Sequence, residues 1–245
     1  MQASRSQGVT QRSADDGTDG RGDAMSGWLA MVGGAEFTPL CTFDRTLLEH
    51  SGGDDVLILP TAAAYEHPGR LVDRGLEWFA TLGATGRGLE LLTRPHALDP
   101  SIADTIRAAT FIYLAGGSPM HLRSVLAHSP AWEAIVDAWE GGAVVAGSVA
   151  GAQVLGDPMV DSRGGAFTLG LGLVKNVAVI PQHDQWSIEA LHRTRVLSQP
   201  GMVLFGVDEA TAAIRHPDGH WTAEGAGQVT VHVGGEPATI DRLSA

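Results

Sequence analysis

The chain has 245 residues, of which 44% are hydrophobic and 18% charged, and its formal net charge is −12. This size and composition predict one globular unit with a substantial buried core. The acidic balance argues against nucleic acid or an anionic membrane surface as the main partner. The longest uncharged run, at 141–156, is too short and too rich in glycine to span a bilayer, so we expect a cytoplasmic protein.

The first 27 residues are rich in Ser, Gly, Asp, Gln and Arg and have no hydrophobic periodicity. Such a segment cannot bury enough surface to offset its ordering entropy, which predicts a disordered N-terminal tail. It also lacks the apolar stretch of a secretory signal. We expect residues 28–245 to form a single α/β domain. The one cysteine, Cys41, cannot form an internal disulfide, and we interpret it as a packing residue.

From residue 28 onward, short apolar runs alternate with amphipathic stretches. The apolar runs predict strands at 28–32, 55–59, 89–92, 111–115 and 143–146. The amphipathic stretches predict helices at 40–50, 68–82, 101–108, 120–127 and 131–139. Continuous apolar strands that alternate with helices are typical of a three-layer fold, in which a mainly parallel sheet has helices on both faces.

The pattern changes after residue 151. Further strands are predicted at 167–174, 177–181, 203–207, 212–215 and 228–233, with one helix at 187–198. The segment His216-Pro-Asp-Gly-His220 is a turn signal between two of these strands. We therefore expect antiparallel strands toward the C-terminus.

Residues 143–152 indicate a buried strand, a sharp glycine-flanked turn and the first turn of a helix. This is the arrangement of a nucleophile elbow, G-x-S-x-G, whose central side chain projects over the end of a parallel sheet. Here the pattern is Gly147-x-Val149-x-Gly151, so Val149 stands where a serine is expected. An isopropyl group has no lone pair and no proton to lose, and it cannot form an acyl-enzyme.

Valine also conflicts with the backbone of such an elbow. The apex normally has a positive φ, which costs a β-branched residue about 1–3 kcal/mol. We expect either that the turn relaxes from this geometry or that the rest of the fold absorbs the cost.

Three other segments place candidate site residues at the ends of strands. Gly116-Gly117 follows one apolar run and offers bare backbone N–H groups, His183 follows a second, and Asp208-Glu209 follows a third. Ligands of open α/β sheets bind beyond the carboxyl ends of the strands. Nucleophile, histidine and acid in this chain order are typical of an elbow-type Ser–His–acid hydrolase. The glycine pairs lack phosphate-loop spacing and the histidines lack metal-ligand spacing, so we expect no cofactor and no metal.

With these segments, the chain resembles the peptidase E and cyanophycinase family of serine peptidases, which has a class I glutamine amidotransferase-like fold. The matching segments lie at 33–36, 115–117, 147–152, 182–183 and 206–212. The resemblance implies a small peptide or amino-acid-like ligand, since family members cleave Asp-X dipeptides or the β-linked Asp-Arg units of cyanophycin. It also implies that neither a metal nor an organic cofactor is needed.

The resemblance also implies roles by position. Val149 occupies the place of the nucleophile, His183 that of the general base, and Glu209 that of the acid that orients the imidazole. The backbone N–H groups of Gly117 and Ala150 would form the oxyanion hole. Asp208, beside Glu209, is the alternative for the acid.

Two departures from the cyanophycinase pattern argue against cyanophycin as the substrate. Ser118-Pro119 stands where a glutamine is expected, and Asp184-Gln185-Trp186 stands where arginines are expected. The elbow also lacks the cysteine of a glutaminase, which argues against amidotransferase chemistry.

Three functions remain open on the sequence alone. The leading hypothesis is a family member with an intact fold and impaired or lost catalysis, a pseudo-peptidase. The second is an active serine exopeptidase or amidohydrolase that uses Ser148 or another nucleophile. The third is a non-catalytic binding or regulatory subunit. Whether the chain forms a homodimer is not determined by the sequence.

Overall fold

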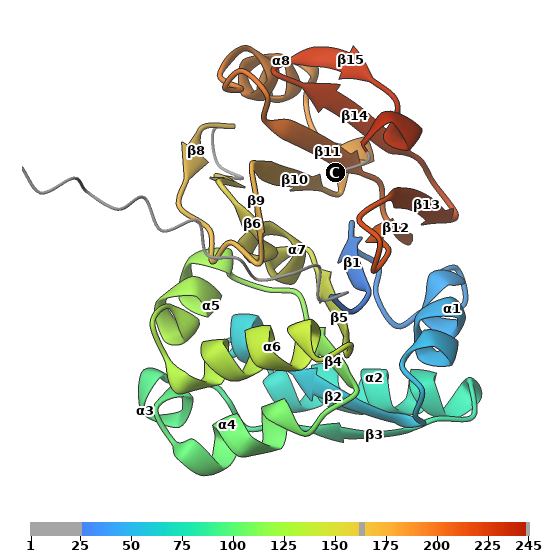
Figure 1. Ribbon diagram of the computed structural model, residues 1–245, viewed down its shortest axis with the longest axis vertical. Coiled ribbons are helices and arrows are strands. Elements are labelled where there is room, and N and C mark those ends of the chain that lie inside the picture. The colour runs from blue at the N-terminus through green and yellow to red at the C-terminus, as the bar shows by residue number, and fades with distance from the viewer. Residues whose placement is uncertain (1–25, 162–164, 244–245) are drawn as a thin grey trace, which may run out of the picture.

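The computed structural model describes residues 26–161 and 165–243 (Figure 1). Residues 1–25 of the expected tail lie outside this range. Ser26 and Gly27 lie inside it, and the Gly27 N–H donates a hydrogen bond to the Trp139 carbonyl at 2.6 Å. The structured part of the chain therefore includes the last two residues of the segment expected to be a tail.

A seven-stranded sheet forms the larger half of the molecule, with the order β13-β12-β1-β5-β4-β2-β3. Its strands are β1 (Leu29–Val32), β2 (Asp55–Leu59), β3 (Thr85–Gly88), β4 (Phe111–Leu114), β5 (Val144–Ser148), β12 (Thr211–Arg215) and β13 (Trp221–Gly225). The five strands from β1 to β3 pair in parallel, whereas β12 pairs antiparallel with both β1 and β13. The mainly parallel sheet with antiparallel strands from the C-terminal part is thus confirmed.

Helices cover both faces of this sheet. They are α1 (Phe43–His50), α2 (Pro68–Thr81), α3 (Arg94–Ala97), α4 (Pro100–Arg107), α5 (Pro119–Leu126) and α6 (Pro130–Glu140), with a 3₁₀ turn η1 (Thr61–Ala63). Ile58 and Tyr113 share a core cluster with Phe79 of α2, whereas Leu57 and Leu114 belong to a cluster with α4, α5 and α6. Successive strand residues point to opposite faces, so the uninterrupted apolar runs supply both cores.

A second sheet packs beside the first, with the order β15-β14-β11-β10-β6-β9. Its strands are β6 (Gly156–Asp157), β9 (Val174–Lys175), β10 (Val177–Pro181), β11 (Val203–Val207), β14 (Val229–Val233) and β15 (Glu236–Ala238). Three helical segments accompany it: α7 (Ala150–Leu155), η2 (His183–Gln185) and α8 (Ile188–Val196). In Figure 1 this sheet lies above the first, with α8 at its outer end and α7 near the junction. A separate pair, β7 (Met159–Val160) and β8 (Phe167–Thr168), and the 3₁₀ turn η3 (Ile240–Arg242) complete the elements.

The strand expected at 89–92 is displaced, because β3 occupies Thr85–Gly88 instead. Its residues Thr-Gly-Arg-Gly carry no apolar signal, since β3 is the edge strand of the sheet and is largely exposed. Leu91 is fully buried beyond the end of this strand, which accounts for the apolar run that the sequence displays. The strand expected at 167–174 is likewise two short strands, β8 and β9, separated by a loop.

Candidate functional site

The nucleophile elbow is present in its strained form. Val149 lies between β5 and α7 with φ 48° and ψ −99°. Its N–H donates to the Val32 carbonyl at 3.0 Å, and its carbonyl accepts from the Gln153 N–H at 3.0 Å. The turn has therefore not relaxed. Of the two outcomes expected from the sequence, the second is the one observed: the rest of the fold compensates for the strain at Val149.

The two flanking glycines allow this turn because neither position has room for a side chain. A Cβ atom on Gly147 would lie 2.5 Å from the Gly151 carbonyl carbon, and one on Gly151 would lie 2.3 Å from the Leu114 carbonyl oxygen. The helix α7 thus approaches β4 and β5 at backbone contact distance. This close packing fixes the direction in which the Val149 side chain leaves the turn.

The glycine pair after β4 lies beside the elbow. Gly117 has a φ of 138°, and a Cβ atom on it would lie 2.4 Å from the Ala62 carbonyl oxygen. Among the residues that the structure describes, no acceptor is found for the N–H of Gly117 or of Ala150. Both donors are available to a bound oxygen atom, as the expected oxyanion hole requires.

Ser118 and Pro119, which depart from the cyanophycinase pattern, begin the helix α5. The Ser118 hydroxyl accepts a hydrogen bond from the His121 N–H at 3.3 Å, and Pro119 is the first helical residue. Serine at the N-cap followed by proline is a favourable helix start. These two residues therefore have a local structural role at this end of the sheet.

Ser148, the last residue of β5, directly precedes the apex of the turn. Its side chain is fully buried, and its hydroxyl donates to Glu36 Oε2 at 3.0 Å. The other oxygen of this carboxylate, Oε1, accepts from the Gly116 N–H at 3.4 Å. The Ser148 hydroxyl is thus directed to Glu36 and contacts neither His183 nor solvent.

Val149 lines a cavity of about 430 Å³, which we call the elbow cavity. Its lining consists of Glu36, Ala63, Glu66, His67, Arg70, Leu71, Arg74, Gly116, Gly117 and Val149. Arg70 and Arg74 are four residues apart on α2, so both lie on the same face of the helix. The guanidinium of Arg74 also donates to the Glu36 carbonyl at 3.4 Å. Sequence reasoning missed both arginines, although their spacing on the expected helix at 68–82 placed them together.

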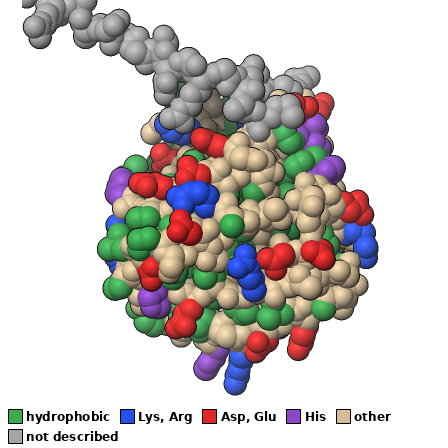
Figure 2. Space-filling view, turned by 60° about the horizontal axis from the view of Figure 1, so that its bottom comes forward, with side chains coloured by type: hydrophobic (Ala, Val, Ile, Leu, Met, Phe, Trp, Pro, Cys, Tyr) green, Lys and Arg blue, Asp and Glu red, His purple; other side chains and the backbone are tan. Residues whose placement is uncertain are grey.

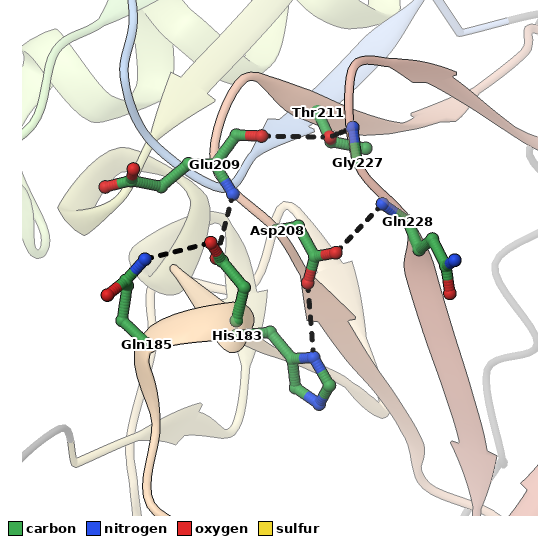
Figure 3. A network of polar contacts seen from close by, with 8 residues as sticks. His183, Gln185, Asp208, Glu209, Thr211, Gly227 and Gln228 are labelled. Atoms are coloured by element: carbon green, nitrogen blue, oxygen red, sulfur yellow. Dashed lines mark hydrogen bonds and ion pairs between the residues drawn. The ribbon is translucent and has the colours of Figure 1, made fainter.

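His183 lies after β10, in η2, and its carboxylate partner is Asp208. The distance between His183 Nδ1 and Asp208 Oδ1 is 3.3 Å, while Asp208 Oδ2 accepts from the Gln228 N–H at 3.0 Å (Figure 3). The ring lies against Gly206, where a Cβ atom would approach His183 Cδ2 to 2.3 Å. His183 lines a second cavity, beneath α8, and not the elbow cavity.

Glu209 does not contact this imidazole. Figure 3 shows its carboxylate directed away from the His183 ring, and Glu209 Oε1 accepts instead from Gln182 Nε2 at 2.8 Å. A Cβ atom on Gly34 would lie 3.1 Å from Gln182 Cγ and 3.3 Å from Val149 Cγ2. The side chains of Gln182 and Val149 thus both border Gly34, and Gln182 is the one with an acidic partner. The structure thus differs from the expected His183–Glu209 pair.

Adjacent residues explain this difference. Gln182 follows β10 in the left-handed conformation, with φ 50° and ψ 42°, and His183 begins the 3₁₀ turn η2, so the two side chains leave the backbone in different directions. Gln182 and Glu209 point toward the elbow, whereas His183 and Asp208 point toward α8. The sequence signal for Gln182 was its place beside His183 in the matching segment, but nothing in the sequence distinguished the two directions.

Cys41 is buried behind the elbow, before α1. Burial raises the pKa of its thiol, and its Sγ donates to the Ala35 carbonyl at 3.3 Å. A thiol with a raised pKa is a poor nucleophile at neutral pH. The geometry agrees with a packing role for this residue.

Within residues 26–161 and 165–243, no group of three or more His, Cys, Asp or Glu side chains could hold a metal ion. None of the helices in this part of the chain is long and apolar enough to cross a membrane.

Comparison with known proteins finds one family and several similar chains. A family model described as peptidase family S51 matches residues 29–221. A cyanophycinase of Trichormus variabilis is 27% identical over 223 residues, covering 81% of this chain and 75% of that protein. A cyanophycinase of Geminocystis herdmanii is 27% identical over 194 residues, covering 74% and 71% of the two chains.

Two solved structures are also similar. A peptidase from an acI-B1 actinobacterium is 30% identical, with a TM-score of 0.74 over 85% of this chain and 90% of that one. A putative peptidase E protein from Listeria monocytogenes is 17% identical, with a TM-score of 0.63 over 82% of this chain and 100% of that one. The second likeness concerns the fold alone, and it agrees with the mixed α/β architecture.

Proposed function

Because the chain belongs to peptidase family S51, we propose that it binds small peptides in the elbow cavity but cannot form the acyl-enzyme of a serine peptidase. The observation that carries this proposal is Val149 at the apex of an intact elbow, with φ 48° and ψ −99°. The apex side chain has the direction of a nucleophile and no atom able to attack a carbonyl carbon.

The neighbour of Val149 strengthens the proposal. A serine nucleophile needs a base that takes its proton, and that base must be oriented by a third group. Gln182 borders Gly34 together with Val149 and is hydrogen-bonded to Glu209, but a carboxamide does not accept a proton near neutral pH. The proposal is thus supported by a valine at the nucleophile position and by a glutamine, not a base, between Gly34 and Glu209.

The elbow cavity suits a peptide with a carboxylate. Arg70, Arg74 and His67 supply N–H donors at its mouth, and arginine binds carboxylates in a bidentate manner. Glu36 and Glu66 lie in the same lining and could pair with a peptide amino group. The N–H groups of Gly117 and Ala150 would receive a carbonyl oxygen.

The alternative of an active enzyme that uses Ser148 has less support. That hydroxyl is fully buried and donates to Glu36, so an attack on a substrate would require the elbow to be rebuilt. A purely regulatory or subunit role is compatible with the same binding cavity, and it would require a partner in addition to the peptide.

Hydrolysis of Asp-X dipeptides by four purified proteins tests the proposal. We expect no turnover by the unmodified chain, weak turnover by Val149→Ser, and at least about 100-fold more by Val149→Ser/Gln182→His, because a positioned base contributes about 10²–10⁴-fold. The control is Val149→Ser/His183→Ala, which should match Val149→Ser. Robust turnover by the unmodified chain would overturn the proposal. Loss of activity only in the His183→Ala protein would instead assign the base to His183.

A further inference from the structure

A second cavity, of about 270 Å³, lies between α8 and the outer face of the second sheet. We call it the α8 cavity, and its lining consists of Ile180, His183, Leu191, Arg195, Leu204, Gly206, Thr230 and His232. In the β11–β14 register, Leu204 is opposite His232 and Gly206 is opposite Thr230, so these four residues share the face toward α8. It has no lining residue in common with the elbow cavity.

One buried nitrogen in the lining of the α8 cavity lacks an acceptor. Arg195 Nε is buried and has no hydrogen-bond partner among the residues that the structure describes. A buried donor without a partner is unfavourable, and for a guanidinium the cost is larger than for a neutral group. The orphaned donor therefore indicates a site that an external acceptor can satisfy.

The charges around the cavity also favour an anion. The pKa of His232 is lowered, first by burial and then by the positive charges of Arg195 and His183, against an opposing effect of Glu236. The only other carboxylate in contact with these groups, within the described residues, is Asp208 at His183 Nδ1. Asp208 contacts Nδ1 of the His183 ring, so Nε2 of the same ring is available to a ligand.

We propose that the α8 cavity binds a small tetrahedral oxyanion, such as phosphate or sulfate, held by Arg195, His232 and His183. A cavity of about 270 Å³ has room for such an anion. Thr230 adds a hydroxyl to the same lining. This site does not depend on the peptide-binding function proposed for the elbow cavity.

Binding of the anion couples to protonation of His232. Burial lowers the pKa of this imidazole from 6.5, and a bound anion stabilises the imidazolium form, so binding strengthens as the pH falls below that value. The charged groups that face the two rings are Arg195, Asp208 and Glu236. Sulfate is the suitable probe, because it does not titrate in this range.

Isothermal titration calorimetry of the full chain with sodium sulfate tests the site. We expect saturable 1:1 binding with a Kd of about 1 mM or tighter at about pH 6, and weaker binding at about pH 8. Arg195→Gln and His232→Gln should each weaken binding about tenfold or more, while Arg193→Gln, on the same helix but outside the lining, should not. Sodium phosphate should bind similarly, and succinate should distinguish a dicarboxylate site from an oxyanion site.

The absence of saturable sulfate and phosphate heat from the unmodified chain would overturn the proposal, whether or not the variants fold. Equal losses in Arg195→Gln and Arg193→Gln would also overturn it, because they would indicate a general charge effect. Arg70→Gln in the elbow cavity should leave sulfate binding unchanged. A failure of this site is therefore distinguishable from a failure of peptide binding.

Discussion

Val149 keeps a positive φ although its side chain is branched at Cβ. The surrounding backbone imposes this conformation, since Gly147 and Gly151 pack too closely for the turn to open. Such a conformation costs a non-glycine residue about 1–3 kcal/mol. The strain thus persists at a residue whose side chain carries no nucleophilic atom.

Replacement of Val149 by glycine should release this strain. The gain exceeds the roughly 0.5–1 kcal/mol entropic cost of glycine, and the isopropyl group that is removed is only half-buried, so we expect Val149→Gly to raise the free energy of unfolding by about 1 kcal/mol. Urea denaturation measures the change. The matched control is Ala152→Gly, within α7, which should lower the free energy of unfolding by about 1 kcal/mol. Equal destabilisation by both substitutions would show that Val149 is not strained.

Much of the candidate site could be predicted at this scale, whereas the pairing of its side chains could not. The elbow, its valine and the glycine pair follow from local patterns in the sequence. The choices between His183 and Gln182, and between Asp208 and Glu209, depend on which way the chain turns after β10 and β11. That direction depends on packing against Gly33 and Gly34. These glycines precede the two strands by more than half the chain, so a local sequence pattern cannot predict the direction.

At the scale of elements, α1 and α2 bury polar groups against the sheet. Asp44 of α1 is fully buried and accepts a hydrogen bond from Trp78 Nε1 of α2 at 2.8 Å, while its Oδ1 has no partner among the described residues. Burial raises the pKa of Asp44 to about 7, and the negative charges of Glu36 and Glu224 act in the same direction. The folded chain therefore holds this carboxyl group protonated over a range in which the unfolded chain ionises it.

This carboxyl group predicts a pH-dependent stability. Because the folded pKa of about 7 lies above the ordinary value of 3.8, its contribution is fully present below about pH 4 and is lost as the pH rises to about 7. The loss is on the order of 4 kcal/mol at most. We expect Asp44→Asn, which keeps the acceptor for Trp78, to be more stable than the unmodified chain at pH 8 and nearly equal to it at pH 4. Urea unfolding of both proteins at both pH values measures this, and a difference independent of pH would contradict it.

Buried elements could be predicted from the sequence more accurately than exposed ones. β2 and β10 were predicted to the residue, since each is an uninterrupted apolar run with a polar flank. β3 and β13 were not predicted, because neither shows a clear hydrophobic pattern. β3 is an edge strand with the sequence Thr-Gly-Arg-Gly, and β13 is half exposed. The four-residue helix α3 was also missed, and it is too short to display a period.

Across the whole molecule, the site lies where the two sheets meet. The Gly33 carbonyl accepts from the Gln182 N–H at 2.8 Å, and the Gly34 carbonyl accepts from the Ala210 N–H at 2.9 Å. A Cβ atom on Gly33 would lie 2.1 Å from the Asp208 carbonyl oxygen. The loop after β1 thus holds the ends of β10 and β11 against the elbow, and it brings together residues that are far apart in the sequence.

Both cavities have basic side chains in their linings, although the molecule as a whole is acidic. The net charge is −12, and acidic side chains are spread over the face shown in Figure 2 among fewer basic ones. Arginines and histidines line the elbow cavity and the α8 cavity nonetheless. In the elbow cavity Glu36 and Glu66 balance the two arginines, whereas the lining of the α8 cavity holds no carboxylate. Positive charge in the α8 cavity favours small anionic ligands over large polyanions, because a polyanion would meet repulsion outside the cavity.

Covalent labelling tests the central claim most directly. The unmodified chain, Val149→Ser and Val149→Ser/Gln182→His should be incubated with a fluorophosphonate probe, and their intact masses measured. The account predicts no adduct on the unmodified chain and one adduct, at residue 149, on the double variant. A stoichiometric adduct on the unmodified chain, at Ser148 or at any other serine, would contradict it.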